Sequence, residues 1–103
     1  KFSAEKLKVA SETMRALAHP KRLIILAYIA EHAPACVNDI FTNLRLEQSV
    51  TSQHLRILRQ ARLVETNRAG KFVYYQVNAK RIENAGIASH LLADFEESPE
   101  TEE

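Results

Sequence analysis

The spacing of apolar residues changes along the chain, and this change restricts the folds that are open to it. From Ala4 to Arg62, apolar residues recur three and four positions apart, which is the period of amphipathic α-helices. From Leu63 to Val77 the chain is instead rich in β-branched and aromatic residues, which favour strands. Helical spacing returns after Asn78. This order predicts a mainly α-helical domain that contains one β-hairpin.

The first two helices are separated by a proline. Residues 4–18 carry an apolar stripe at helical spacing, and His19-Pro20 interrupts it. Because proline is disfavoured inside a helix but fits its first turn, Pro20 is expected to open a second helix that runs to about His32. Residues 33–35 are expected to form a connector.

Two shorter helices follow, over residues 37–44 and 47–62, with a tight turn at Arg45-Leu46. This spacing is typical of a helix-turn-helix. The second of these helices has an inner face of Val50, Thr51, Leu55, Leu58 and Ala61. Its outer face carries Gln48, Ser49, Ser52, Gln53, Arg56, Arg59 and Gln60. No acidic residue lies between Gln48 and Ala61, whereas an ordinary solvated helix would normally carry acids as well.

The strand-like segments cover residues 63–68 and 72–77, and Ala69-Gly70 between them indicates a hairpin turn. A final helix is expected to present Ile82, Ala85, Ser89, Leu92 and Phe95 along one side. The last residues are mostly Glu, Ser, Pro and Thr, which cannot bury enough apolar surface to become ordered. We therefore expect one domain over residues 1–95 and a disordered acidic tail over residues 96–103.

The net charge of +1 conceals an uneven distribution of charge. All 14 Lys and Arg residues lie between Lys1 and Arg81, whereas six of the 13 acids lie in the last ten residues. Residues 40–81 carry eight basic residues against Glu47 and Glu65, a balance of +6. A basic body of this kind indicates a polyanionic partner, although charge alone fits a solvated surface with a solubilising tail equally well.

Taken together, these motifs resemble the ArsR/SmtB family of winged-helix repressors. The matching stretches are His19-Pro20-Lys21-Arg22-Leu23, Gln48-Ser49-Val50-Thr51-Ser52-Gln53-His54-Leu55-Arg56-Ile57-Leu58, Ala61-Arg62-Leu63-Val64 and Arg68-Ala69-Gly70-Lys71-Phe72-Val73-Tyr74-Tyr75. Two positions depart from the family pattern, because Glu47 replaces a small capping residue and Arg62 stands where glycine is usual. The resemblance implies a winged helix-turn-helix with the order α-α-α-α-β-β-α and a homodimer that represses transcription.

The helix over residues 47–62 is the expected recognition helix in the DNA major groove. Gln53 can pair with adenine and Arg56 with guanine, while Arg68 and Lys71 at the hairpin tip can hold the DNA backbone. His54 can either contact a phosphate or pack at the helix edge. The expected DNA-binding residues are Gln48, Ser49, Thr51, Ser52, Gln53, His54, Arg56, Arg68 and Lys71.

The first and last helices are expected to pair two copies of the chain about a two-fold axis. This would place two recognition helices about 34 Å apart, which matches a palindromic operator in double-stranded DNA. The expected interface residues are Leu7, Ala10, Met14, Leu17, Ile82, Ala85, Ser89 and Leu92. The alternative is a monomer in which the terminal helices complete the chain's own core.

Two metal sites that the family uses are incomplete in this sequence. One retains only Cys36, and the other retains only His90 and Asp94. We therefore expect no metal and no cofactor, and any small-molecule effector is unknown. The alternative is a metal- or thiol-responsive repressor that uses Cys36 and His32.

Other function classes find little support in the sequence. No catalytic pattern stands out, so an enzyme is not expected. A single cysteine excludes an intrachain disulfide, and no apolar stretch is long enough to span a membrane, so we expect a cytoplasmic protein with no membrane association. The remaining alternative is a winged-helix module that binds a protein partner, but Arg56, Arg59 and Arg62 do not fit the neutral or acidic face that this would require.

Overall fold

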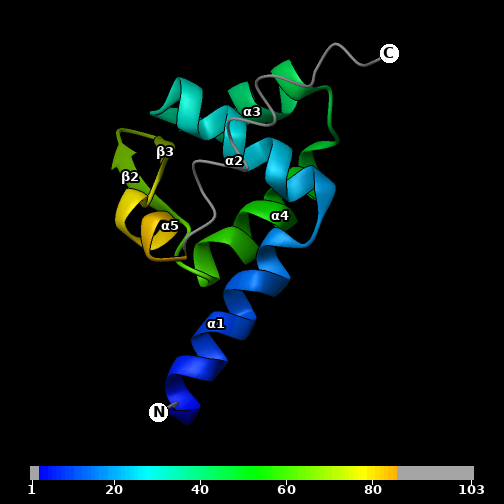
Figure 1. The fold of residues 1–103 in the computed structure, drawn as a ribbon. Helices are drawn as coiled ribbons and strands as arrows, with labels where there is room; N and C mark the ends of the chain where they lie inside the picture. Colours follow the sequence, from blue (N-terminus) through cyan, green and yellow to red (C-terminus); the bar gives the residue numbers. More distant parts are fainter. Residues whose placement is uncertain (1–2, 86–103) are drawn as a thin grey trace.

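The computed structural model describes residues 3–85 of the 103-residue chain. Within this range, the elements are α1 (Ala4–Leu17), α2 (Pro20–His32), β1 (Ala35–Cys36), α3 (Val37–Leu44), α4 (Gln48–Gln60), β2 (Val64–Ala69), β3 (Phe72–Val77) and α5 (Ala79–Ala85). The order confirms the predicted mainly α-helical fold with a β-hairpin wing (Figure 1).

The first two helices begin at local capping signals. The Ser3 side chain accepts a hydrogen bond from the Lys6 backbone N–H at 3.1 Å. Pro20 occupies the first turn of α2, and Nδ1 of His19 accepts from the Lys21 backbone N–H at 3.2 Å. These bonds satisfy N–H groups that have no partner within the helix. The prediction that Pro20 opens the second helix is confirmed.

The three strands form one antiparallel sheet in the order β1-β3-β2. The hairpin register runs from Val64 opposite Val77 to Ala69 opposite Phe72, so the loop is Gly70-Lys71, one residue later than predicted. Gly70 has φ 67°, a value that the first residue of a type II′ turn requires. The prediction that Ala35 lies in a connector was wrong, because β1 pairs with β3 at Ala35 and Cys36.

The core lies where α2, α3 and α4 meet the base of the hairpin. Its fully buried side chains are Ile25, Ile29, Ile40, Leu55, Leu58, Leu63 and Val64, together with the smaller Thr51. Each of these helices therefore contributes an apolar face to one shared core, which fixes how α4 sits on α2 and α3. None of the helices described in residues 3–85 is long and apolar enough to cross a membrane.

The predicted interface residues of α1 and α5 fall into two groups. Leu7 and Met14 on α1 are 52% and 68% exposed, whereas Leu17 and Ile82 are buried in the chain's own core. Ala10 is exposed on the same helix. In Figure 1 the N-terminal part of α1 extends away from the other elements, and α5 contacts α1 nearer its C-terminal end, where Nη2 of Arg81 donates to the Thr13 hydroxyl at 2.9 Å. The side chain of Ala85, the residues Ser89 and Leu92, and the tail over 96–103 lie outside the described part of the chain.

Candidate nucleic-acid interface

A tight turn joins α3 to α4. Arg45 ends α3 in the left-handed conformation with φ 58°, and the Leu46 N–H donates to the Phe41 carbonyl at 2.9 Å. This pattern satisfies the last carbonyls of α3 and redirects the chain within three residues. The turn therefore delivers α4 across α3, as the predicted helix-turn-helix requires.

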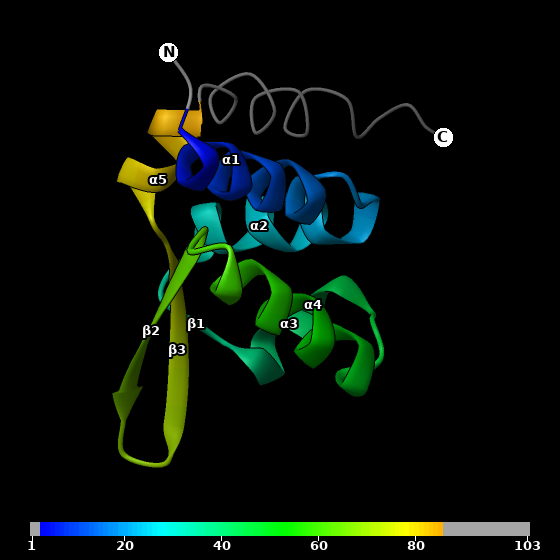
Figure 2. The same cartoon turned by 90° about the horizontal axis from the view of Figure 1, so that it is seen from below.

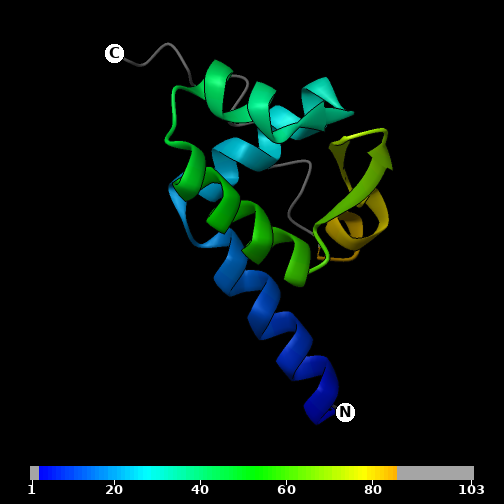
Figure 3. The same cartoon turned by 180° about the vertical axis from the view of Figure 1, so that it is seen from behind.

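The outer face of α4 is exposed and polar. Figure 3 shows α4, in green, on the surface of the molecule with the hairpin beyond its C-terminal end. Its exposed polar residues are Gln48, Ser49, Ser52, Gln53, Arg56, Arg59 and Gln60. The opposite face is anchored in the core by Leu55 and Leu58. Seven polar side chains without an acid among them therefore project from a rigidly packed helix.

The N-terminus of α4 leaves backbone donors available. Glu47 is the N-cap residue, but its side chain makes no capping hydrogen bond. The first N–H groups of a helix have no partner within the helix, and together with the helix dipole they favour an anion such as phosphate. The Glu47 carboxylate is the only acidic group at this end of α4 among the described residues.

Two predicted DNA-contact residues are buried beneath α4, which corrects their placement. Thr51 is fully buried, and its hydroxyl donates to the Glu47 carbonyl at 2.8 Å. His54 is 8% exposed and packs against the start of α2. Helical geometry turns both side chains toward the core, so neither lies on the outer face with Gln53 and Arg56. The possibility that His54 packs at the helix edge describes its position better than a phosphate contact.

The surroundings of His54 are cationic. Its ring centroid lies 4.6 Å from that of His19, and its Nδ1 lies 3.4 Å from Nη1 of Arg22. Burial lowers the pKa of His54 below 6.5, and the positive charges of His19, Arg22 and Lys21 lower it further. The ring is therefore neutral near pH 7. Sequence reasoning did not find this contact, because Arg22 and His54 are 32 positions apart.

The hairpin places two cations away from the helical body. Figure 2 shows the hairpin and the α3–α4 pair on the side of α2 opposite to α1. Arg68 on β2 and Lys71 in the loop are both exposed, and Gly70 between them supplies the positive φ of the turn. Both cations can therefore reach an anion that approaches the same side of the molecule as α4.

The aromatic residues of the wing have different environments. Tyr75 packs against the core, opposite Ala35 of β1. Tyr74 is half-buried and its ring centroid lies 6.3 Å from that of Phe72. Phe72 is 52% exposed near the tip, a position that sequence reasoning did not single out. Successive residues of a strand point to opposite faces, so Phe72 and Val73 cannot both face the core. The position of Phe72 next to the hairpin turn was the available signal that it would be exposed.

The residues that could sense a metal or an oxidant do not form a cluster. Cys36 is a free, buried cysteine in β1. The exposed His32 ring stacks on Tyr28, with 4.2 Å between the ring centroids, and its Nδ1 lies 3.1 Å from the Tyr28 carbonyl oxygen. Within the described residues, no three His, Cys, Asp or Glu side chains are placed to hold a metal ion together.

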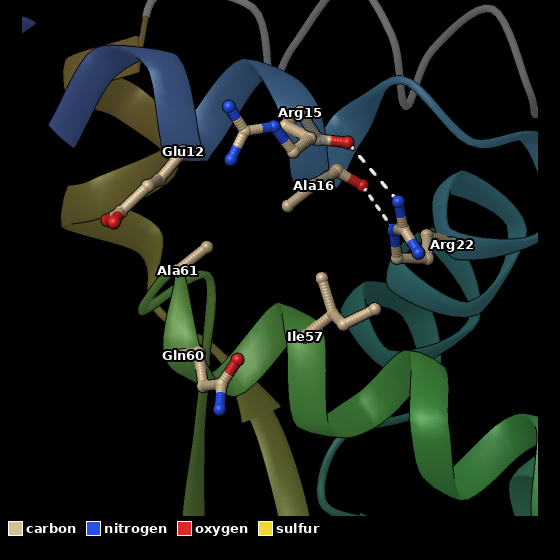
Figure 4. A pocket seen from close by; sticks show the side chains of 7 residues that line it. All are labelled: Glu12, Arg15, Ala16, Arg22, Ile57, Gln60 and Ala61. Atoms are coloured by element: carbon tan, nitrogen blue, oxygen red, sulfur yellow. Dashed lines mark hydrogen bonds between the residues drawn. The ribbon is translucent and has the colours of Figure 1, made fainter. Parts of the chain in front are cut away.

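A cavity of about 400 Å³ lies between α1, α2 and α4. Its lining consists of Glu12, Arg15, Ala16, Arg22, Ile57, Gln60 and Ala61, and Figure 4 shows Ile57 pointing from α4 toward α1. The Arg22 guanidinium forms one end of this cavity, where it is held by two carbonyl oxygens of α1 (Figure 4).

Comparisons with known proteins agree with this geometry. The model of the family described as "Bacterial regulatory protein, arsR family" matches residues 19–66. The chain is 34% identical to the transcriptional repressor SmtB homolog of Synechocystis sp., over 87% of this chain and 69% of that protein.

Solved structures are similar as well. The structure of the transcriptional repressor PagR of Bacillus anthracis matches with a TM-score of 0.75 and 32% identity, covering 86% of this chain and 99% of that one. The homodimeric winged helix-turn-helix domain of a possible ArsR-family regulator from Mycobacterium bovis matches with a TM-score of 0.75 at 24% identity, over 91% and 90% of the two chains, and supports the fold.

The relatives are transcriptional regulators and not enzymes, which confirms the expectation that this chain is not an enzyme. The stretch matched by the family model contains the α3–α4 pair and the start of the wing. The chain therefore belongs to the ArsR/SmtB family of winged helix-turn-helix, DNA-binding transcriptional regulators.

Proposed function

We propose that this protein is a homodimeric repressor that binds a palindromic operator through the outer face of α4. The observation that carries the proposal is the exposed, acid-free polar face of a helix whose other face is locked into the core. A helix of this kind fits the major groove, where its N-terminal residues meet the base edges. A rigid mounting matters because base readout requires side chains at fixed positions.

The residues on the outer face are suited to different contacts with DNA. Gln53 is suited to a bidentate pair with adenine, and Arg56 to a bidentate pair with guanine. Ser49 and Ser52 are short, exposed and able to bond bases or phosphates. The major-groove set in the proposal is Gln48, Ser49, Ser52, Gln53 and Arg56, without the buried Thr51 and His54.

The wing supplies contacts that do not depend on sequence. The hairpin lies on the same side of α2 as α4 in Figure 2, and its exposed Arg68 and Lys71 are suited to phosphate oxygens. Because each neutralised phosphate releases counterions, binding is expected to weaken steeply as the salt concentration rises. Substitution of Lys71 by Ala is expected to reduce the salt dependence by about one unit of slope per protomer and to leave the sequence preference unchanged.

Dimerisation is proposed to use the exposed apolar side of α1. Leu7 and Met14 are large apolar side chains that the described part of the chain leaves half or more exposed. A second copy related by a two-fold axis would cover both residues and would set the two α4 helices about 34 Å apart. The domain from Mycobacterium bovis, which has a similar fold, is described as homodimeric, and this supports the proposal of a homodimer.

We also propose that DNA binding needs no metal and that Cys36 has a structural role. Its burial at the edge of the sheet supports a packing function, since reactive thiols are usually accessible. The affinity for DNA is expected to be the same with and without zinc, copper or oxidant. A loss of binding on adding one of these, absent in Cys36→Ser, would instead establish a responsive repressor.

The proposal is tested by selection of bound duplexes from a random pool, followed by fluorescence anisotropy. An inverted repeat with half-sites about one helical turn apart, bound by two chains per duplex, is the expected outcome. Arg56→Ala is expected to weaken binding by about 1–3 kcal/mol. The matched control is Gln76→Ala, which alters an exposed residue of β3 that is not among the proposed DNA contacts. Equal affinities for Arg56→Ala, Gln76→Ala and the unmodified protein would refute the assignment.

A further inference from the structure

Direct packing between α1 and α4 is interrupted. The cavity of about 400 Å³ separates the C-terminal half of α1 from the C-terminal half of α4. Both helices pack on α2. The connection between α1, which is expected to mediate dimerisation, and α4, which is expected to read DNA, therefore runs largely through α2. A residue of α2 that contacts both helices can fix the position of one relative to the other.

Arg22 of α2 makes such a double contact. Its Nε donates to the Ala16 carbonyl at 2.7 Å and its Nη2 to the Arg15 carbonyl at 3.2 Å (Figure 4). These carbonyls belong to the last turn of α1, where the helix dipole favours a cation, and the Arg15 carbonyl also accepts from the Ala18 backbone N–H at 3.3 Å. One end of the planar guanidinium is thereby fixed to α1 by two charge-assisted bonds.

The opposite side of the guanidinium meets the recognition helix. Nη1 of Arg22 lies 3.4 Å from Nδ1 of His54. Arginine has no acceptor, so a hydrogen bond here requires that Nδ1 of His54 carries no proton. The neutral ring accepts from Arg22, whereas the doubly protonated ring would face the guanidinium with a second donor and a like charge.

We propose that the Arg22–His54 contact positions the recognition helix relative to α1, and that it does so only while the His54 ring is unprotonated. This inference rests on the proposed function of α4. It makes DNA affinity sensitive to protons at a buried residue that does not itself touch DNA.

Among the described residues, every charge that acts on His54 is positive. Burial is the main cause of its lowered pKa, followed by His19, Arg22 and Lys21 of the α2 start. The other elements packed on α4 are α3 and β2, whose charged residues are Asp39, Glu65 and Arg68, and none of these acts on the ring. Within residues 3–85, therefore, no acid stabilises a protonated His54, and a proton that binds there weakens the contact between Arg22 and His54.

The predicted pH dependence has a diagnostic sign. Protonation of exposed histidines adds positive charge and strengthens DNA binding as the pH falls. Protonation of His54 would instead release Arg22 and loosen α4, which weakens binding. A fall in affinity on acidification thus cannot come from general electrostatic attraction.

The test measures the affinity for the duplex selected from the random pool at pH 7.5 and pH 5.5, at constant ionic strength. The unmodified protein is expected to bind more weakly at pH 5.5, with a loss of at most about tenfold per pH unit for each protomer that takes up a proton. His54→Gln, whose amide oxygen can accept from Arg22 without titrating, is expected to keep its own pH 7.5 affinity within about twofold. His32→Gln removes an exposed histidine of α2 and is expected to lose as much affinity on acidification as the unmodified protein does.

A direct measurement follows the ring itself. Long-range ¹H–¹⁵N spectra of the free protein report whether Nδ1 of His54 is unprotonated, and backbone amide shifts of α4 report its position. The two are expected to titrate together, with circular dichroism showing that the helices persist. This readout remains informative if His54→Gln does not fold.

The outcomes separate the two proposals. If no duplex is recovered and none is bound at either pH, the proposed DNA function fails. The NMR titration alone then shows whether protonation of His54 shifts α4. If DNA is bound but acidification leaves affinity unchanged or raises it, or if His54→Gln loses affinity as the unmodified protein does, the inference is overturned. The same holds if the α4 amides do not follow the His54 titration.

Discussion

Replacement of Arg62 by glycine is expected to stabilise the protein. Arg62 follows the C-terminus of α4 with φ 63°, and its backbone N–H and that of Leu63 bond to the Arg59 and Leu58 carbonyls, both at 2.9 Å. This is the helix-ending position that favours glycine, because a Cβ is strained in the left-handed region. The family resemblance implies that glycine is usual here, and the positive φ of Arg62 gives a physical reason for that expectation.

The magnitude follows from two opposing effects. A non-glycine residue takes the left-handed conformation at a cost of about 1–2 kcal/mol. Glycine adds freedom to the unfolded chain, which offsets about 0.4–1 kcal/mol of that gain. The Arg62 side chain is exposed, so its loss removes little packing. Arg62→Gly is therefore expected to gain about 0.5–1 kcal/mol, which raises the thermal midpoint by on the order of 4 °C at fixed protein concentration.

Two control variants distinguish backbone strain from loss of the side chain. Arg62→Ala removes the charge but keeps the Cβ, so it should leave the midpoint nearly unchanged. Arg59→Gly introduces the same residue within the last turn of α4, where it should destabilise by about 0.5–1 kcal/mol. Differential scanning calorimetry of the three variants checks the prediction. If Arg62→Gly lowers the midpoint as Arg59→Gly does, the argument from backbone strain is wrong.

Three further changes test other parts of the account. Glu47→Ser should supply the missing cap of α4 and stabilise the fold by about 0.5–2 kcal/mol, measured by urea denaturation; a lower midpoint would contradict it. Leu58→Ala should destabilise by about 2–5 kcal/mol, because this fully buried side chain leaves a cavity, and a change below about 1 kcal/mol would show that the site collapses. Replacing both Leu7 and Met14 with Lys should lower the sedimentation mass from roughly twice 11.7 kDa to about 11.7 kDa; an unchanged mass would place the dimer interface elsewhere.

The sequence predicted the elements that local chemistry determines. Pro20 marks the start of α2, and the spacing of the apolar residues predicts α3, α4 and the hairpin. The strand β1 was missed because Ala35 and Cys36 have no strand signal of their own and are extended only through pairing with β3. Tertiary context therefore decided the one element that the sequence pattern left out.

The candidate site was predicted unevenly for a similar reason. Helical spacing identifies an apolar stripe but does not say whether it packs on the same chain or on a partner, so Leu17 and Leu7 looked alike although only Leu17 is buried. The contact between His54 and Arg22 joins residues 32 positions apart, so no local sequence pattern predicts it. Exposed positions such as Gln53 needed only the helix period and were predicted correctly as outward-facing.

The most direct test of the central claim is a second selection from the random pool with Gln53→Ala in parallel with the unmodified protein. If α4 reads base edges, the variant should lose a preference at one symmetric pair of positions and keep the remainder of the inverted repeat. The Gln76→Ala control should recover the original sequence in full. An identical consensus from Gln53→Ala and the unmodified protein would contradict the claim that the outer face of α4 reads DNA.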